Sequence, residues 1–389
     1  MSATADRRAQ LRDQIIHVGS GAIRGAADDV TASGWRRIAV LASRSAADAG
    51  LLELARQAIP SGAKVVLEHV GVSPHSPAEE TEHLAETMTG LDPDAMLCVG
   101  GGKVSDAAKG VSILLASGGH LVDHCTTFVP PADYRAPAGV TARLPIIAVP
   151  TTLSGAELTP GGGVRTPAGE KRAFWAKDSA ARLVAYDVEV LRRTPRHILG
   201  GTGMNALAHC VEGMYSRTSS PYSDALAQAA ARDLMSGLRQ LAAGARADEV
   251  FFQLGSAAAL AGLVIGTART GLHHAMCHVL GARLGLAHGD ANGVMLAHVL
   301  RYNTDRASRP LTRLAEAVDR RLASPEQLAD SIQALVAELG NACRLRDLGV
   351  TSADLPMLAA AVRHERGLYF NPEPVPSEAD VLGILKRAW

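Results

Sequence analysis

Four histidines lie within the 19-residue segment GLHHAMCHVLGARLGLAHG, which runs from Gly271 to Gly289. Three of them, His274, His278 and His288, follow one another at spacings of 4 and 10 residues. Side chains four residues apart share one face of a helix. Imidazoles grouped in this way can bind a metal ion, transfer protons near neutral pH or form a hydrogen-bonded core. The segment by itself leaves all three interpretations open.

A glycine-rich turn is the second candidate site. Gly100, Gly101 and Gly102 follow the apolar run AMLCV and precede a helix-like segment. Glycine lets backbone amides approach a ligand without interference from Cβ, and the start of a helix favours an anionic group such as a pyrophosphate. The motif is not the G-x-G-x-x-G fingerprint. A tight turn without a ligand is therefore the alternative.

A second polar loop, VPTTLSGAELTP, runs from Val149 to Pro160 after another apolar run. Thr151, Thr152 and Ser154 place hydroxyl groups at the carboxyl end of that run, where open parallel sheets bind ligands. Taken alone, the loop is also consistent with a capped turn. Two such loops after strands of one sheet favour a nucleotide site more than either loop does singly.

Alternating strands and helices must position these loops. Five short apolar runs in the first half predict strands separated by helices, and this order indicates parallel βαβ units; the runs cover residues 37–43, 63–70, 95–102, 145–152 and 182–187. After about Pro195 the pattern is helical almost throughout. We therefore expect an α/β domain over residues 1–197 and an all-helical domain over residues 198–389, with a ligand cleft between them.

Composition restricts the class of protein. The 389 residues carry 39 basic and 39 acidic side chains, so a nucleic-acid footprint or a basic membrane face is not expected. The five cysteines are widely spaced and form no C-x-x-C pair, which is typical of a reducing compartment. No secretory signal is apparent at the N-terminus, and no continuous apolar run reaches the length of a membrane span. We expect a cytoplasmic protein.

Five segments together resemble one family. GGGKVSDAAK, PTTLSGAELT, GMNALAHCVEGMYS, HHAMCHVLG and NPEPV occur in the order that is similar to the iron-containing (group III) alcohol dehydrogenase superfamily, and most similar to its maleylacetate reductase branch. The resemblance begins near residue 20 and continues to the last residue. It implies the dehydroquinate synthase-like fold of that superfamily, in which a dinucleotide-binding domain with a parallel sheet precedes a helical domain, and a homodimer.

The resemblance also implies NADH or NADPH as the hydride donor. The three glycines, with Ser105 and Asp106, would then hold the pyrophosphate, and Thr151, Thr152 and Ser154 would line the nicotinamide side. The choice between the two cofactors stays open. The first strand ends at Ser43 and Arg44, without the carboxylate that binds the ribose diol of NAD, and Arg44 is either a partner for a 2′-phosphate or a solvated surface side chain.

Metal-dependent members of the superfamily use an aspartate and three histidines. The corresponding positions here are Asn205, His209, His274 and His288. A neutral amide is a poorer ligand for a divalent ion than a carboxylate, and it leaves the site one negative charge short. We therefore expect no bound metal, and we expect the imidazoles to bind substrate and transfer protons. A metal held by these four side chains is the alternative.

The resulting hypothesis is an NAD(P)H-dependent reductase of a conjugated oxo-acid, with reduction of maleylacetate to 3-oxoadipate, a step of aromatic catabolism, as the leading candidate. His278 and Tyr369 are the expected proton donors, together with His274 as a catalytic side chain. His209, His288 and Asn205 would shape the substrate pocket. The alternatives are a metal-dependent alcohol dehydrogenase or aldehyde reductase of the same fold, a lyase of the dehydroquinate synthase type and a non-catalytic NAD-binding module.

Two positions bear on the charge of the substrate. Ala275 and Glu373 stand where the maleylacetate reductases that this chain resembles have a lysine and an arginine. If both positions line the cleft, the substrate carries fewer negative charges than maleylacetate. If they do not, the two substitutions are neutral.

Overall fold

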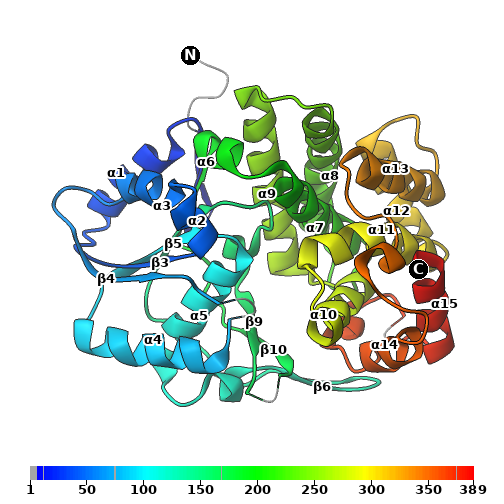
Figure 1. Cartoon of the computed structure of the whole chain (residues 1–389), viewed down its shortest axis with the longest axis horizontal. Helices are drawn as coiled ribbons and strands as arrows, with labels where there is room; N and C mark the ends of the chain where they lie inside the picture. The colour runs from blue at the N-terminus through cyan, green and yellow to red at the C-terminus, as the bar shows by residue number, and fades with distance from the viewer. Residues whose placement is uncertain (1–6, 12, 74–75, 168, 374) are drawn as a thin grey trace. The chain divides into compact units, whose positions relative to one another are not determined.

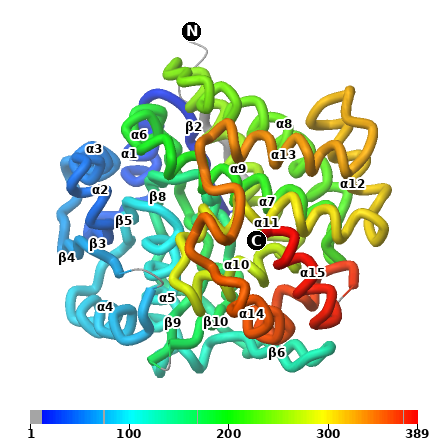
Figure 2. The backbone as a smooth tube through the Cα atoms, turned by 45° about the vertical axis from the view of Figure 1, so that its right-hand side comes forward, coloured from blue at the N-terminus to red at the C-terminus, as the bar shows by residue number. Residues whose placement is uncertain are grey.

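The computed structural model describes residues 7–11, 13–73, 76–167, 169–373 and 375–389, and its backbone is drawn in Figures 1 and 2. The chain folds into two compact units. The first contains Met1–Thr126, Ala136–Pro195 and Ala247–Ala259, and the second contains Thr127–Arg135, Arg196–Arg246 and Leu260–Trp389. This division differs from the expected domains, 1–197 and 198–389, in two short segments that join the other unit.

A seven-stranded sheet forms the centre of the first unit, in the order β1-β2-β11-β8-β5-β3-β4. All five predicted strands are confirmed, as β3 (Arg37–Ala42), β4 (Lys64–Val70), β5 (Ala95–Gly100), β8 (Ile146–Pro150) and β11 (Leu183–Asp187). β1 (Arg7–Leu11) and β2 (Gln14–Gly19) were not predicted; β1 pairs antiparallel with β2, and the other pairings are parallel. Every residue of β5, β8 and β11 is buried, as apolar strands covered on both faces require.

Helices cover both faces of this sheet. On one face pack α1 (Ala22–Ala32), α2 (Arg44–Asp48) and α3 (Leu51–Ala55), against alternate residues of β3 and β5. Figure 1 shows α4 (Ala78–Leu91) and α5 (Gly102–Ser117) on the opposite face. The short helix α6 (Val188–Arg193) follows β11, and β9 (Gly161–Arg165) pairs with β10 (Lys171–Trp175) in a separate two-stranded sheet. The predicted parallel sheet is thus confirmed, with helices on both faces and one antiparallel strand, β1, at its edge.

The second unit is a set of packed helices and a small hairpin of β6 (Thr127–Val129) and β7 (Asp133–Arg135). Its helices are α7 (Arg196–Tyr215), α8 (Pro221–Ala242), α10 (Leu272–Leu284), α11 (His288–Asn303), α12 (Ser308–Val318), α13 (Pro325–Glu338), α14 (Leu355–Val362) and α15 (Glu378–Ala388). Among the described residues no strand follows β11, which confirms the predicted helical second half.

Two glycines allow α7 and α11 to approach each other closely. A Cβ atom built on Gly201 of α7 would lie 3.1 Å from the Cα atom of Gly289, and one built on Gly289 would lie 3.0 Å from the Cα atom of Gly201. In both cases the group that it meets is backbone, which cannot turn aside. The first turn of α11, which begins at His288, therefore lies directly against α7.

The helix α9 (Asp248–Ala268) has the length and composition of a membrane-spanning segment. Its most apolar 18-residue window is 61% buried inside the protein, as in a core helix. No other helix in the described part of the chain has this length and hydropathy. Gln253, Gly255 and Ser256 interrupt the apolar residues of α9, so the segment contains no continuous apolar run of that length.

Candidate active site

One face of α7 supplies three polar side chains to the interior of the second unit. Asn205, His209 and Glu212 are spaced by four and three residues, so they lie on the same helical face. All three are buried, and Glu212 has no exposed surface. The rest of α7 is largely apolar or glycine, and it packs against α8 and α11. The polar face of α7 therefore needs partners from another helix.

His274 of α10 is that partner. Its Nδ1 atom is in short contact with the Glu212 carboxylate, and its Nε2 atom lies 3.1 Å from Oδ1 of Asn205. Both ring nitrogens are thus held, one by a carboxylate and one by an amide. This arrangement fixes the orientation of the ring and makes Glu212 the group that determines where the His274 proton resides.

Glu212 also caps the start of α10. Its Oε1 atom accepts hydrogen bonds from the backbone N–H groups of Gly271, at 2.9 Å, and His274, at 3.3 Å. The Tyr215 hydroxyl donates to the same oxygen at 3.3 Å. Burial raises the pKa of Glu212, while these donors and the nearby imidazoles oppose that shift by stabilising the carboxylate. The first turn of α10 and the His274 ring are therefore anchored to α7 through one carboxyl group.

His209 stacks on His274. Their ring centroids are 4.9 Å apart and their planes differ by 18°. Burial, and then the neighbouring His274, lower the pKa of His209 well below its usual value, so the ring is neutral near pH 7. Among the described residues its buried Nδ1 atom has no hydrogen-bond partner. His209 thus presents an unsatisfied nitrogen to the site.

His278 and His288 are the solvent-exposed members of the histidine cluster, whereas His209 and His274 are buried. Their rings stack with centroids 5.9 Å apart, and each lies about 6 Å from the His274 ring. His278 is about one-fifth exposed and pairs with Glu365 through Nδ1 at 3.3 Å, while His288 is exposed. The structure therefore brings the predicted residues Asn205, His209, His274, His278 and His288 into one cluster.

Tyr369 has a different environment. It lies on a 3₁₀ turn, η5 (Arg366–Phe370), whose N-cap is Glu365. Its ring stacks on Tyr134 at 5.4 Å, and the Arg217 guanidinium lies over it at 5.6 Å. These contacts show the ring held by aromatic and cationic neighbours, and the proton-donor role of Tyr369 stays a prediction.

His273, next to His274, faces the core. It has no exposed surface, and its Nε2 atom lies 3.2 Å from the backbone oxygen of Asn292. Burial lowers its pKa to about 4. Within the described part of the chain, Glu212, His273 and His274 form the group whose potential metal-ligating atoms all lie within 4.8 Å of one another. The family resemblance predicts a different set, Asn205 with His209, His274 and His288. Among the described residues these three histidines do not form such a group.

In the first unit, the two predicted cofactor loops lie side by side. Gly100 of β5 pairs with Pro150 of β8, and the N–H group of Thr151 donates to the Gly100 oxygen at 3.0 Å. Gly101 is the N-cap of α5, and a Cβ atom built on it would lie 2.8 Å from Cγ2 of Thr152. The two loops, which were expected to follow strands of one sheet, are therefore neighbours at its carboxyl edge.

The other residues expected to bind cofactor are placed around this edge. Thr152 donates to Ser154 at 3.3 Å. Ser105 is buried, and its hydroxyl has no hydrogen-bond partner among the described residues. Asp106 accepts from the N–H group of Gly163 at 3.0 Å and lies 3.5 Å from the Lys109 ammonium group. Asp106 is thus engaged within the protein, and direct cofactor contacts stay a prediction for all of these side chains.

A buried lysine fixes the second loop. Lys109 has no exposed surface and donates to the backbone oxygens of Ala156 and Gly161, both at 2.7 Å. Burial lowers its pKa, and Asp106 and Glu157 oppose that shift. Neither this lysine nor Glu212 was singled out as a site residue from the sequence. The spacing of Glu212 from Asn205 and His209 was the signal that could have identified it.

Comparison with known proteins identifies the family. Residues 13–188 match the iron-containing alcohol dehydrogenase model, and residues 201–389 match the Fe-containing alcohol dehydrogenase family, C-terminal, model. A maleylacetate reductase from Burkholderia cepacia is 30% identical over 94% of this chain and 93% of its own length. The chain belongs to the iron-containing alcohol dehydrogenase family. Because the family and this maleylacetate reductase are oxidoreductases, this protein is an oxidoreductase rather than a lyase or a non-catalytic module.

Solved structures share the fold of this chain. An iron-containing alcohol dehydrogenase from Thermococcus thioreducens superimposes with a TM-score of 0.86 at 23% identity, covering 98% of this chain and 99% of that one. A sulfoacetaldehyde reductase from Bifidobacterium kashiwanohense, in complex with NAD+, superimposes with a TM-score of 0.85 at 24% identity, covering 98% of each chain. The fold class predicted from the sequence is confirmed.

The positions of Ala275 and Glu373 do not indicate a substrate with fewer negative charges. Ala275 is buried in an apolar core cluster of the second unit. Glu373 is exposed and paired with Arg306, and it accepts a hydrogen bond from the Tyr302 hydroxyl at 3.2 Å. A lysine at position 275 would have to enter that core, and Glu373 already pairs with Arg306. Neither position therefore indicates a less anionic substrate.

Proposed function

We propose that this family member is an NAD(P)H-dependent reductase of a conjugated oxo-acid, with maleylacetate as the leading substrate. The observation that carries the proposal is the His274 ring, which is held between the Glu212 carboxylate and the Asn205 amide. In this arrangement an amide occupies the position where the family's metal-dependent members have a carboxylate. The matching relative from Burkholderia cepacia is a maleylacetate reductase, which supports the same substrate class.

The reaction requires a hydride, which a nicotinamide bound in the first unit would supply. Gly100, Gly101 and Gly102 fit such a cofactor, because a side chain at Gly101 would fill the space next to Thr152. The N-terminus of α5, with Gly101 as N-cap, is the positive end of a helix dipole, which favours an anionic group such as a pyrophosphate. The NAD+ complex of the sulfoacetaldehyde reductase supports this cofactor class.

The histidine cluster would act on the other half of the reaction. As hydride adds to the alkene carbon, negative charge develops on the ketone oxygen of the substrate, and a positioned donor must stabilise that oxygen. His278 is suited to this role, because it is partly exposed and its Nδ1 atom is paired with Glu365. We assign the delivery of a proton to His278 and Tyr369, and the fixing of the pocket to His274, His209, His288 and Asn205.

The donor set does not favour the family's metal. Of the four corresponding positions one is an amide, and His209 and His274 stack in nearly parallel planes. The Glu212 carboxylate, which could supply a negative charge, already pairs with His274. We therefore derive no step through a metal, and the metal-free enzyme stays a prediction.

The second candidate is a metal-dependent alcohol dehydrogenase or aldehyde reductase. The close approach of Glu212, His273 and His274 favours it, since these side chains could hold a divalent ion after rearrangement. Metal analysis of the purified protein, and activity after exhaustive chelation, separate the two candidates. A stoichiometric metal whose removal abolishes turnover would establish the second.

The test of the first candidate compares NADH and NADPH oxidation with maleylacetate and with simple aldehydes. We expect maleylacetate to have the higher kcat/KM. Tyr369→Phe and His278→Ala should each lower kcat by about 10²-fold or more, because general acid groups act on the transition state. Near-normal kcat in both variants would remove them from the mechanism. We further propose a cytoplasmic homodimer that binds neither nucleic acid nor membranes.

A further inference from the structure

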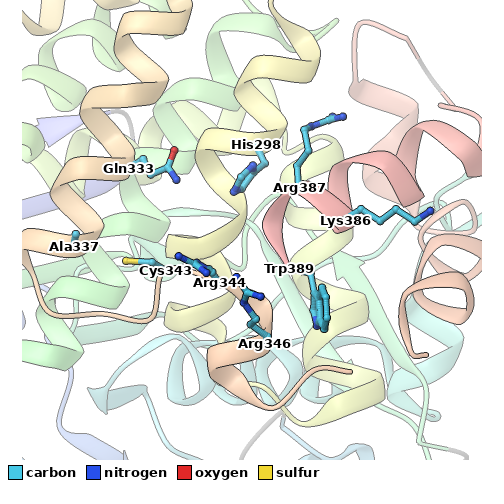
Figure 3. A pocket seen from close by; sticks show the side chains of 9 residues that line it. All are labelled: His298, Gln333, Ala337, Cys343, Arg344, Arg346, Lys386, Arg387 and Trp389. Atoms are coloured by element: carbon cyan, nitrogen blue, oxygen red, sulfur yellow. The ribbon is translucent and has the colours of Figure 1, made fainter. Parts of the chain in front are cut away.

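The second unit contains a cavity whose walls are strongly basic. It has a volume of about 550 Å³, within the range of small-molecule sites. Six of its lining residues are basic or aromatic: His298, Arg344, Arg346, Lys386, Arg387 and Trp389. They come from α11, the 3₁₀ turn η4 (Leu345–Leu348) with its N-cap, and the end of α15 (Figure 3). None of the histidines of the candidate active site lines this cavity.

Local packing holds the two central arginines at the cavity. Leu345 is fully buried, and Arg344 and Arg346 on either side of it are exposed. The Arg346 guanidinium lies 5.5 Å from the ring centre of Trp389. The indole N–H group of Trp389 donates in turn to the backbone oxygen of Val350 at 2.8 Å. Arg346 is therefore positioned before any ligand arrives.

The cations of this cavity lack acidic partners among the described residues. No carboxylate side chain is among the residues that line it. In the described part of the chain, no ion pair joins Arg344, Arg346, Lys386 or Arg387 to an acidic group, although Arg301, Arg306, Arg313 and Arg321 of the same unit each pair with a carboxylate. Figure 3 shows Arg344 and Arg346 near the centre, with Lys386 and Arg387 extending outward from α15. Four such positive charges around one cavity repel one another, and a bound anion would relieve that repulsion.

A neutral imidazole forms one wall. Burial, and then Arg301 and Arg387, lower the pKa of His298 to about 4. Near pH 7 its ring is uncharged and offers one N–H donor beside the guanidinium groups. Arginine forks and a neutral donor together match a group with several oxygen acceptors.

We propose that this cavity binds a small multivalent oxyanion, one that carries phosphate groups or several carboxylates. The guanidinium groups of Arg344 and Arg346 form the centre of the site, and Lys386 and Arg387 supply further positive charge at its rim. The site is separate from the proposed reductase chemistry and does not depend on it.

Cys343 provides a local reporter, because it lines the cavity and is partly exposed, while the other four cysteines are buried. We would measure its alkylation by the uncharged reagent N-ethylmaleimide, at constant ionic strength, with inorganic pyrophosphate or citrate as the probe. Pyrophosphate could also bind at the glycine loop of the first unit, and the reaction of Cys343 does not report that event. We expect either probe to slow the alkylation several-fold, with saturation.

Variants of the basic side chains test whether the protection of Cys343 comes from a probe bound in this cavity. Arg344→Gln combined with Arg346→Gln should weaken the protection by about tenfold or more, since each charge-assisted hydrogen bond contributes on that scale. Arg320→Gln, an exposed arginine outside the cavity, should behave as wild type. Lys386→Gln with Arg387→Gln provides a second test if the first pair disturbs folding, which circular dichroism would show.

Each result of the alkylation experiment either supports or overturns the proposed oxyanion site. Protection by citrate alone indicates a polycarboxylate, protection by pyrophosphate alone indicates a phosphate ester, and either supports the site. Unchanged alkylation of the wild-type protein up to about 10 mM of both probes, far above a useful affinity, would overturn the proposal. Equal protection in both folded double variants would also overturn it.

Discussion

Replacing Glu212 by glutamine removes one buried charge and changes almost nothing in shape. In the wild-type protein the carboxylate accepts from two backbone N–H groups, from Tyr215 and from His274. The glutamine oxygen can keep the two backbone bonds, and its NH₂ group then faces Nδ1 of His274. An NH₂ group can only donate, so Nδ1 must become an acceptor and the ring proton must move to Nε2.

The size of the effect follows from these bonds. The capping of α10 survives, while the bonds to a charged carboxylate become bonds to a neutral amide in a fully buried site. Hydrogen bonds to charged groups contribute roughly 1.5–3 kcal/mol, so we expect the free energy of unfolding to fall by about 2 kcal/mol. If the His274 tautomer matters for turnover, kcat should fall by about 10²-fold.

Urea unfolding, steady-state kinetics and ¹⁵N spectra of the histidine rings measure these three quantities. Glu316→Gln, an exposed glutamate on α12, is the matched control and should change none of them. A Glu212→Gln protein with unchanged unfolding free energy, turnover and His274 ring spectrum would refute the reasoning.

Three further predictions follow from the two sites and the buried imidazoles. Gly101→Val should abolish tight NAD(P)H binding in a fluorescence titration, because its Cβ atom would lie 2.8 Å from Thr152; unchanged affinity in a folded variant would contradict the assigned loop. Asn205→Asp should raise the content of bound divalent metal, measured by elemental analysis, while wild-type activity survives chelation; loss of wild-type activity that iron(II) or zinc restores would favour the metal enzyme. The pKa values of His273 and His298 are lowered from 6.5 to about 4. Below pH 6.5 the unfolded chain therefore binds protons that the folded protein does not. The free energy of unfolding should be highest above pH 6.5 and fall as the pH drops toward 4, by up to about 3 kcal/mol for each histidine. Urea unfolding at pH 7 and pH 5 measures this change, and equal free energies of unfolding at the two pH values would contradict the prediction.

The sequence was sufficient to predict the parallel sheet, because its central strands are short apolar runs that end in polar loops. It did not predict β1 and β2, since Arg7–Leu11 (RRAQL) contains two arginines and a glutamine and lies in a polar N-terminal segment. The pairing of β1 depends on its neighbour in the sheet rather than on its own composition.

The sequence predicted which residues form the candidate site, but not the hydrogen bonds that join them. The spacing of histidines in the sequences of α7 and α10 identified which imidazoles could lie close together. The bond between Glu212 and His274 joins residues 62 positions apart in sequence, and no local pattern specifies it. The position of Ala275 shows the same limit, because its place in the apolar core follows from how α10 packs and not from its neighbours in the chain.

The close approach of Gly201 and Gly289 has a consequence for engineering. Replacing helical glycines by alanine is a common route to thermostability, since it removes flexibility from the unfolded chain at a gain of about 0.5–1 kcal/mol each. At these two positions a methyl group would meet backbone at 3.0–3.1 Å, so the helices would have to separate. His288 is the neighbour of Gly289, and Asn205 lies one helical turn beyond Gly201. A stabilising screen should leave both glycines unchanged, because separating α7 from α11 would move His288 away from Asn205 and His209.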